Sequence, residues 1–218
     1  MVWTSWLAWL LGAFAAGSVP FAVLIGRARG VDIRRHGSGN PGATNLGRAA
    51  GKKWGLLCFG LDVGKGLGPT LAYGTLLPAA ALSGPDAARW VAVGIAAVAG
   101  HMFSPLLGFR GGKGVATGLG AALGLFPVVT VPAGLAFVAW FVTAKLSGYV
   151  GLASVVAAGL LPPLTAVSGW GFGLGGAATA VFTALTAVLS GLVIFRHRGN
   201  LARLRAGEEP RARWTGRA

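Results

Sequence analysis

The chain has 218 residues, of which 54% are hydrophobic and 11% charged, and its formal net charge is +14. Soluble domains typically carry about 25% charged residues, so a soluble fold of this length could not bury so much apolar surface. A strongly basic chain can bind nucleic acid, but here the basic residues lie between apolar segments, as the positive-inside rule of membrane proteins expects. The composition therefore predicts an all-α polytopic membrane protein with no nucleic-acid partner.

The chain is expected to form one membrane domain over residues 1–218, ending in a basic tail at 196–218, because no linker rich in Ser, Pro or acidic residues divides it. The N-terminal apolar stretch has no basic n-region and runs on to Ile25, so we interpret it as a first membrane span and not as a cleaved signal peptide. A single cysteine, Cys58, excludes an intramolecular disulfide.

Membrane crossings are predicted from apolar stretches of about 20 residues. Such stretches are Trp3–Gly26, Trp54–Leu77, Trp90–Leu107, Tyr149–Val167 and Leu174–Phe195.

The remaining apolar stretch, Val115 to Ala144, is too long for one crossing, because its length as a single helix would be about 45 Å. The turn-prone Phe126–Pro127 and Pro132 favour a hairpin of two short helices, with Lys145 marking the next loop. This gives seven helices, some short or re-entrant. Five full spans with a re-entrant pair is the alternative.

Basic residues set the orientation, because Lys and Arg accumulate on the cytoplasmic side. Two segments hold seven each: Arg27, Arg29, Arg34, Arg35, Arg48, Lys52 and Lys53 in the first, and Arg196, Arg198, Arg203, Arg205, Arg211, Arg213 and Arg217 in the tail. We expect both segments and the GFRGGKG loop (Gly108–Gly114) to be cytoplasmic. The N-terminus is then outside and the C-terminus in the cytoplasm.

Small polar side chains alternate with glycines over Val31–Lys53, the larger part of the first basic segment, which we call the first polar segment. Glycines let backbone N–H groups face an anion, and small hydroxyl and amide side chains add hydrogen-bond donors. Arg48 can supply a planar fork for phosphate. These residues are Gly37, Ser38, Gly39, Asn40, Gly42, Thr44, Asn45 and Gly47. The pattern predicts an anion site, with a flexible positive loop as the alternative.

The second polar segment, Gly100–Gly120, contains Gly111-Gly112-Lys113-Gly114 at the start of a predicted helix. Free N–H groups at a helix N-terminus and an adjacent lysine can bind an anion. The nucleotide-binding P-loop motif is absent, because Gly114 stands where a Ser or Thr would hold magnesium. The segment predicts a phosphate cradle without a nucleotide, and a tight turn between two spans is the alternative.

His197 and Asn200 lie three residues apart at the end of the last apolar stretch, so they share one face if the helix continues. Histidine can exchange a proton near neutral pH, and asparagine can orient a hydroxyl. Arg203 extends this face. Ser154, in YVGLAS (Tyr149–Ser154), adds a hydroxyl near the same membrane face. For the segment that holds His197 and Asn200, the alternative interpretation is a basic tail at the membrane surface.

Three ionisable residues lie within apolar stretches. Asp62 and Lys65 are three apart, and charge inside a membrane is usually paired or functional. We favour an ion pair that supports the site over direct contact with a substrate. His101 is interpreted as a hydrogen-bonded structural residue, with a ligand role as the alternative. No Cys, His and Asp cluster has the spacing of a metal site, so neither a metal nor another cofactor is expected.

These segments together resemble the bacterial acyl-phosphate:glycerol-3-phosphate acyltransferase (PlsY) family. The matching stretches are GSVPF (Gly17–Phe21), the run from Asp32 to Asn45, LDVGKG (Leu61–Gly66), Gly100–Thr117 and HRGNLARLRAGEE (His197–Glu209). The resemblance implies transfer of a fatty acyl group from acyl phosphate to glycerol 3-phosphate, giving 1-acyl-glycerol 3-phosphate and phosphate in phospholipid synthesis. It also implies a multi-pass protein of the bacterial cytoplasmic membrane with its active site facing the cytoplasm.

The resemblance also implies roles for individual residues. Glycerol 3-phosphate would be bound by Ser38, Arg48, Lys113, His197 and Asn200, and acyl phosphate by Thr44, Asn45, Gly111, Gly112 and Ser154. Lys113, His197 and Asn200 would act in catalysis, and the proton acceptor would be His197 or the phosphate of the donor. The expected partners are the two substrates, membrane lipid and the enzyme that produces acyl phosphate.

Two other classes of protein remain as alternatives. A transporter or channel for an anionic solute would place polar residues along its helices to line a path, whereas here the polar residues concentrate in three loops. A non-enzymatic phospholipid-binding scaffold is the other alternative.

Overall fold

The computed structural model describes residues 3–77 and 82–211, and within these ranges the regular structure is entirely helical. The expected all-α class is therefore confirmed. The helices of the first part are α1 (Trp3–Ser18), α2 (Phe21–Ala28), η1 (Ile33–Arg35), α3 (Ala43–Ala50), α4 (Lys52–Gly74), α5 (Gly84–Met102), η2 (Pro105–Leu107) and α6 (Val115–Gly124). They are followed by α7 (Thr130–Ser147), α8 (Val150–Gly171), α9 (Gly176–Arg196) and α10 (Arg198–Arg205).

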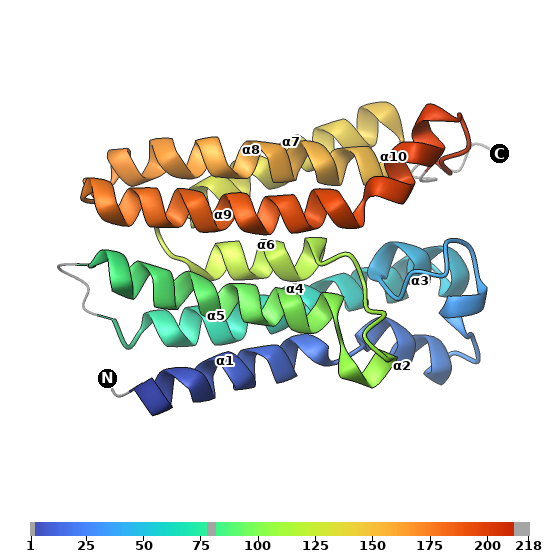
Figure 1. Ribbon diagram of the computed structural model, residues 1–218. Coiled ribbons are helices and arrows are strands. Elements are labelled where there is room, and N and C mark those ends of the chain that lie inside the picture. The colour runs from blue at the N-terminus through green and yellow to red at the C-terminus, as the bar shows by residue number, and fades with distance from the viewer. Residues whose placement is uncertain (1–2, 78–81, 212–218) are drawn as a thin grey trace. The chain divides into compact units, whose positions relative to one another are not determined.

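The chain divides into two compact units. Unit 1 contains residues 1–80 and 89–126, and unit 2 contains residues 81–88 and 127–218. In unit 1, α1, α4, α5 and α6 run side by side, and α2 and α3 lie at one end of them (Figure 1). In unit 2, α8 packs against both α7 and α9, and α10 extends from the end of α9. The prediction of a single domain over residues 1–218 stays a prediction, and residues 212–218 of its basic tail lie outside the described residues.

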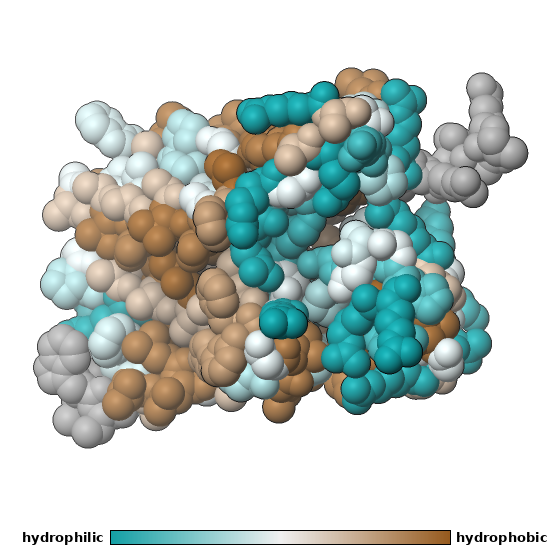
Figure 2. Space-filling model, turned by 45° about the vertical axis from the view of Figure 1, so that its right-hand side comes forward, coloured by the Kyte–Doolittle hydropathy of each residue, from teal (hydrophilic) through white to brown (hydrophobic). Residues whose placement is uncertain are grey.

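Five segments among the described residues are long and apolar enough to cross a membrane: Ser5–Ala28, Gly84–Leu107, Thr130–Ser147, Val150–Gly171 and Gly176–Arg196. Large hydrophobic side chains are exposed along them, among them Leu11, Val138, Phe141 and Val188. Figure 2 shows these apolar surfaces along the helices, and hydrophilic residues gathered over the end of unit 1 that carries α2 and α3. Exposed apolar side chains on long helices are what lipid contact requires.

The first predicted span is not one continuous helix, because α1 ends at Ser18 and α2 begins at Phe21. Pro20 explains the break, since it has no N–H group for an intrahelical bond. The carbonyl groups released at the break find other donors. Ser104 Oγ donates to the carbonyl of Ser18 at 2.7 Å, and Lys65 Nζ donates to the carbonyl of Val19 at 2.8 Å.

Other predicted boundaries were partly right. The stretch 115–144 does form two helices, α6 and α7, separated at residues 125–129. The placement of a loop at Lys145 was wrong, because Lys145 lies in the last turn of α7 and the chain turns only at Gly148, whose φ is 77°. The span expected from Trp90 begins earlier, at Gly84, where the Ser83 hydroxyl accepts a hydrogen bond from the Asp86 N–H and caps the helix.

Close packing between α4 and α6 depends on two glycines. A Cβ at Gly66 would lie 2.1 Å from the carbonyl oxygen of Thr117, and one at Gly120 would lie 2.0 Å from that of Val63. Small residues at such positions allow membrane helices to approach closely, which strengthens their dispersion contacts. This contact fixes the start of α6 against the middle of α4, close to the polar residues described below.

We therefore expect Gly66→Ala to lower the free energy of unfolding in detergent by about 1–3 kcal/mol, because the added methyl group forces the two helices apart. Gly64→Ala on the same helix is the matched control, since a Cβ there meets nothing within 4 Å. Thermal unfolding of the purified protein measures both. Equal stability of the two variants would contradict the close contact.

Candidate active site

Asn45 organises the first polar segment. Its side chain is 2% exposed, its Nδ2 donates to the carbonyl groups of Ile33 at 2.8 Å and His36 at 3.0 Å, and its Oδ1 accepts from the N–H of Ser38 at 3.3 Å. A Cβ at Gly37 would lie 2.6 Å from the same Oδ1, so Gly37 also permits this close approach. The carboxamide thus holds the segment together, and the expected contact of Asn45 with acyl phosphate stays a prediction.

The segment is folded and is not a flexible linker. Asp32 caps η1 by accepting hydrogen bonds from the side chain and the backbone N–H of Arg34, both at 3.2 Å. These bonds, the side-chain one first, hold the pKa of Asp32 below its ordinary value. Ile33 and Leu46 enter a buried apolar cluster with Ala22, Val23 and Cys58, which fastens the segment to α2 and α4.

Thr44 and Arg48 lie four residues apart on α3, so they share one face of the helix, and both are exposed. Ser38 is exposed as well, and its hydroxyl accepts a hydrogen bond from the N–H of Asn40 at 3.4 Å. These three residues therefore remain in positions from which they can reach a solvent-borne anion.

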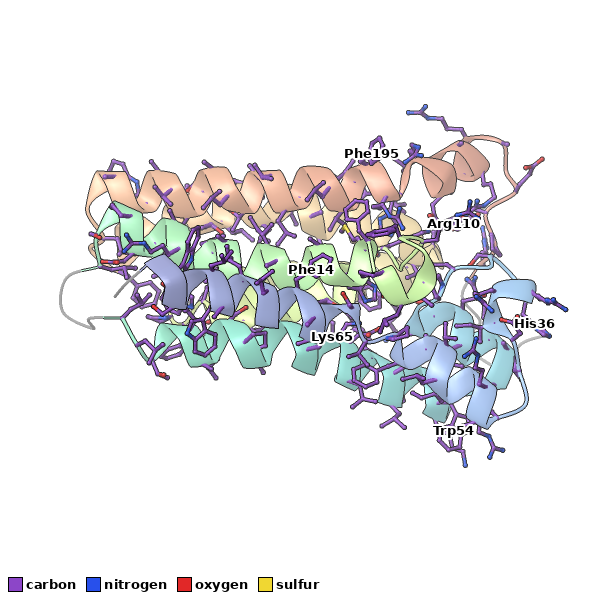
Figure 3. The ribbon with its side chains drawn as sticks, turned by 60° about the horizontal axis from the view of Figure 1, so that its bottom comes forward. Phe14, His36, Trp54, Lys65, Arg110 and Phe195 are labelled. Atoms are coloured by element: carbon purple, nitrogen blue, oxygen red, sulfur yellow. The ribbon has the colours of Figure 1, made fainter. Side chains whose placement is uncertain are left out.

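The rim of this region carries a residue cluster typical of a membrane interface. The guanidinium of Arg29 and the ammonium of Lys53 lie 4.9 Å and 5.1 Å from the centre of the Trp54 ring. Trp and basic residues together mark the headgroup level of a bilayer. Figure 3 shows Trp54 at the outer edge of unit 1, and His36 on the loop at the same end.

The Gly-Gly turn before α6 is built differently from the expected phosphate cradle. The N–H of Gly111 donates to the carbonyl of Met102, and the N–H of Gly112 to the carbonyl of His101, both at 3.1 Å. The two glycines are required by close packing, because a Cβ at Gly111 would lie 2.0 Å from the carbonyl oxygen of His101 and one at Gly112 would lie 2.2 Å from its Nε2. The expected anion site would then draw its donors from the first N–H groups of α6, which lack intrahelical partners, and from the half-buried Lys113.

The two polar segments of unit 1 meet at one pocket. Its lining includes Pro41 from the first segment and Gly112 from the second, together with the ionisable Asp62, Lys65 and His101. The predicted ion pair is present, with Lys65 Nζ 2.9 Å from Asp62 Oδ1. Its position beside both segments agrees with the expectation that it supports the site.

His197 is the junction between α9 and α10, so the helix does not continue unbroken through it as the sequence reasoning had required. Its side chain is 3% exposed, and its Nδ1 lies 2.8 Å from the carbonyl oxygen of Val193. A carbonyl can only accept, so Nδ1 carries the proton and Nε2 of the neutral ring is an acceptor. This is the tautomer that a hydroxyl-orienting or proton-accepting histidine needs.

Glu209 contacts two residues of the last polar run, and the sequence reasoning did not single it out. It is buried, its Oε1 accepts from Asn200 Nδ2, and its Oε2 pairs with Arg203 Nε at 2.9 Å. The sequence signal was its place within the HRGNLARLRAGEE run. Glu209 fixes the orientation of the Asn200 amide, which also packs against Gly151, where a Cβ would lie 2.8 Å from the Cβ of Asn200.

Ser154 serves the packing of unit 2. Its Oγ donates to the carbonyl of Val150 at 2.8 Å and accepts from Trp140 Nε1 at 3.1 Å, so it links α8 to α7. The side chain is 2% exposed, and the expected contact of Ser154 with the acyl donor stays a prediction.

The fold and the apolar helices define a multi-pass membrane protein with glycine-rich polar segments. Residues 7–207 match the family model described as glycerol-3-phosphate acyltransferase. The chain is 44% identical over 214 residues to the glycerol-3-phosphate acyltransferase of Pseudomonas aeruginosa, covering 93% of this chain and 98% of that protein. It is 42% identical over 211 residues to that of Anaeromyxobacter sp. strain K, covering 92% and 96%.

Two crystal structures of PlsY, an integral membrane glycerol 3-phosphate acyltransferase, have the same fold. The glycerol 3-phosphate form superposes with a TM-score of 0.79 at 35% identity, and the lysophosphatidic acid form with 0.78 at 34%, each covering 95% of both chains. The chain therefore belongs to the glycerol-3-phosphate acyltransferase (PlsY) family. It is a multi-pass membrane acyltransferase that acylates glycerol 3-phosphate in phospholipid synthesis.

The Asn45 network generates a local prediction. We expect Asn45→Asp, which keeps the size of the side chain but loses both N–H donors, to destabilise the protein by about 1–3 kcal/mol. Hydrogen exchange of the backbone amides at residues 33–38 should accelerate most, since their segment is held by Asn45. Exchange that increases equally along the whole chain would contradict this local role.

Proposed function

We propose that this acyltransferase takes its acyl group from acyl phosphate and releases inorganic phosphate. The motif resemblance to acyl-phosphate-dependent enzymes supports this donor. The observation that carries the proposal is that the two polar segments of unit 1 approach one pocket, through Pro41 and Gly112. The first segment also bears Thr44 and Arg48, and the second bears Lys113 and leads into α6. Two phosphorylated substrates need two such sets of anion-binding groups.

The reaction requires little covalent help from the protein. The hydroxyl of glycerol 3-phosphate attacks the acyl carbonyl carbon, an ester C–O bond forms, the anhydride C–O bond to phosphate breaks, and phosphate departs with its electron pair. Acyl phosphate is an activated mixed anhydride, so positioning of the hydroxyl and stabilisation of the developing charge supply most of the acceleration. The hydroxyl proton passes to His197 or to the departing phosphate.

We assign the binding roles as follows. Glycerol 3-phosphate is bound by Ser38, Arg48, Lys113, His197 and Asn200, and the phosphate of the donor by Thr44 and the N-terminal turn of α6. Gly111, Gly112, Asn45 and Ser154 belong to the proposed donor site as well, and they also shape it, since the N–H groups of the two glycines, the Asn45 amide and the Ser154 hydroxyl bond within the protein. The enzyme that produces acyl phosphate is the proposed source of the donor.

The basic segments support a topology with seven membrane-associated helices, the N-terminus outside and the active site facing the cytoplasm of a bacterium. Arg29, Lys53 and Trp54 support the placement of the α2–α4 end at a headgroup layer. Such a site receives soluble glycerol 3-phosphate from the cytoplasm and the acyl chain of the donor from the lipid.

The donor is tested with purified protein, synthetic acyl phosphate and glycerol 3-phosphate, by following phosphate release and the formation of 1-acyl-glycerol 3-phosphate. We expect release that depends on glycerol 3-phosphate, and a loss of about 10²-fold or more in kcat/KM for Lys113→Ala. An acyl thioester offered in place of acyl phosphate is the control. Product formed from the thioester and not from acyl phosphate would overturn the proposed donor.

His197 is tested by His197→Asn, which keeps a donor for the Val193 carbonyl but loses the Nε2 acceptor. We expect kcat to fall by about 10²–10⁴-fold, whether the lost group orients the hydroxyl or accepts its proton. His36→Asn is the matched control, because the Nδ1 of His36 also faces a backbone carbonyl, that of Asp32 at 2.9 Å. If the two variants lost activity equally, His197 would have no special role.

A further inference from the structure

Three ionisable side chains are buried together in unit 1 beside the Gly-Gly turn. Asp62, Lys65 and His101 are 2%, 8% and 8% exposed. Asp62 Oδ1 lies 2.9 Å from Lys65 Nζ and 3.7 Å from His101 Nδ1. Burying charges is costly even when they are paired, and an apolar pair of similar volume is often as stable. The cluster therefore calls for a function beyond stability.

One side of the cluster holds the break between α1 and α2. Lys65 Nζ donates to the carbonyl of Val19 at 2.8 Å and lies 5.6 Å from the centre of the Phe21 ring. Figure 3 shows Lys65 at the junction of these two helices. Asp62 thus pairs with a lysine that donates to a carbonyl at the break between the two helices.

The other side of the cluster supports the turn that carries Lys113. The His101 carbonyl accepts from the N–H of Gly112, and the His101 ring presses on Gly112, where a Cβ would lie 2.2 Å from Nε2. The opposite ring nitrogen, Nδ1, faces Asp62. The orientation of the ring therefore depends on Asp62, and the position of Gly112 depends on the ring.

We propose that Asp62, Lys65 and His101 are positioning residues that set Lys113 and the first turn of α6 against the Pro41 segment. The same pocket is lined by all three residues and by Pro41 and Gly112. They act through the turn and do not touch substrate, and the inference rests on the proposed role of Lys113 in binding glycerol 3-phosphate. Loss of the cluster is expected to weaken phosphate binding in a protein that still folds.

The test is the double variant Asp62→Asn with Lys65→Met, which removes both charges and leaves no unpaired buried ion. Binding of glycerol 3-phosphate to the purified protein in detergent is measured by titration calorimetry, which reports Kd and the fraction of competent protein separately. We expect the Kd to rise about tenfold or more, since small displacements of positioned groups have effects of this size or larger. A merely structural role would lower the competent fraction and leave the Kd unchanged.

A second variant, His101→Gln, introduces no buried charge and decides the question if the double variant does not fold. It loses the ring between Asp62 and Gly112, and the same rise in Kd is expected. Thr70→Val is the matched control on α4, because the buried hydroxyl of Thr70 donates to the carbonyl of Gly66 on the same helix. Its Kd should stay within about twofold of the parent value.

The inference is overturned if the folded double variant, or His101→Gln where the double variant is unfolded, binds glycerol 3-phosphate within twofold of the parent. Failure of the proposed donor is a separate result. In that case the parent binds glycerol 3-phosphate but releases no phosphate from acyl phosphate, and the Kd comparison still decides the role of the cluster.

Discussion

The buried ion pair between Asp62 and Lys65 is the contact on which the geometry of unit 1 depends. Lys65 donates to the Val19 carbonyl at the helix break beside Pro20, and Asp62 pairs with the lysine and faces His101. Each of these groups would be costly in an apolar interior without the next. The helix break, the ion pair and His101 therefore depend on one another.

The cluster lies beside the loops that are proposed to carry the site. His101 packs against Gly111 and Gly112. By the inference above, this contact inside the apolar part of the protein sets the position of Lys113 and of the N-terminus of α6. On the neighbouring segment, Asn45 plays the corresponding role, tying together Ile33, His36 and Ser38 through its carboxamide. Residues that hold the loops are thus distinct from the exposed residues available to a phosphate.

In unit 2 as well, some residues hold others in place. Val193 fixes the tautomer of His197, Glu209 orients Asn200 and binds Arg203, and Ser154 joins α8 to α7. An enzyme that relies on positioning more than on covalent catalysis gains most from such supports, because the rate depends on how closely the reacting groups are held. Exposed apolar side chains, such as Val138 and Phe141 on α7, provide the surface that contact with lipid requires.

The sequence by itself determined the class of protein, the approximate helices and the polar segments. Apolar stretches of membrane length are a strong local signal, as are the Gly-rich runs around Ser38 and Lys113 and the paired Asp62 and Lys65. Family membership also followed from these motifs. The helix break at Pro20, which was not predicted, and the end of α7 beyond Lys145, which was predicted wrongly, depend on hydrogen bonds and turns that hydropathy does not report.

Only the tertiary structure showed which polar groups of these segments bond within the chain. Asn45, Gly111 and Gly112 have the composition of an anion site, yet their polar groups face the chain itself. Whether a donor faces solvent or a carbonyl depends on segments distant in sequence, as when Lys65 reaches Val19 across 46 residues. Such partners are chosen by packing, and residue type and spacing carry no record of that choice.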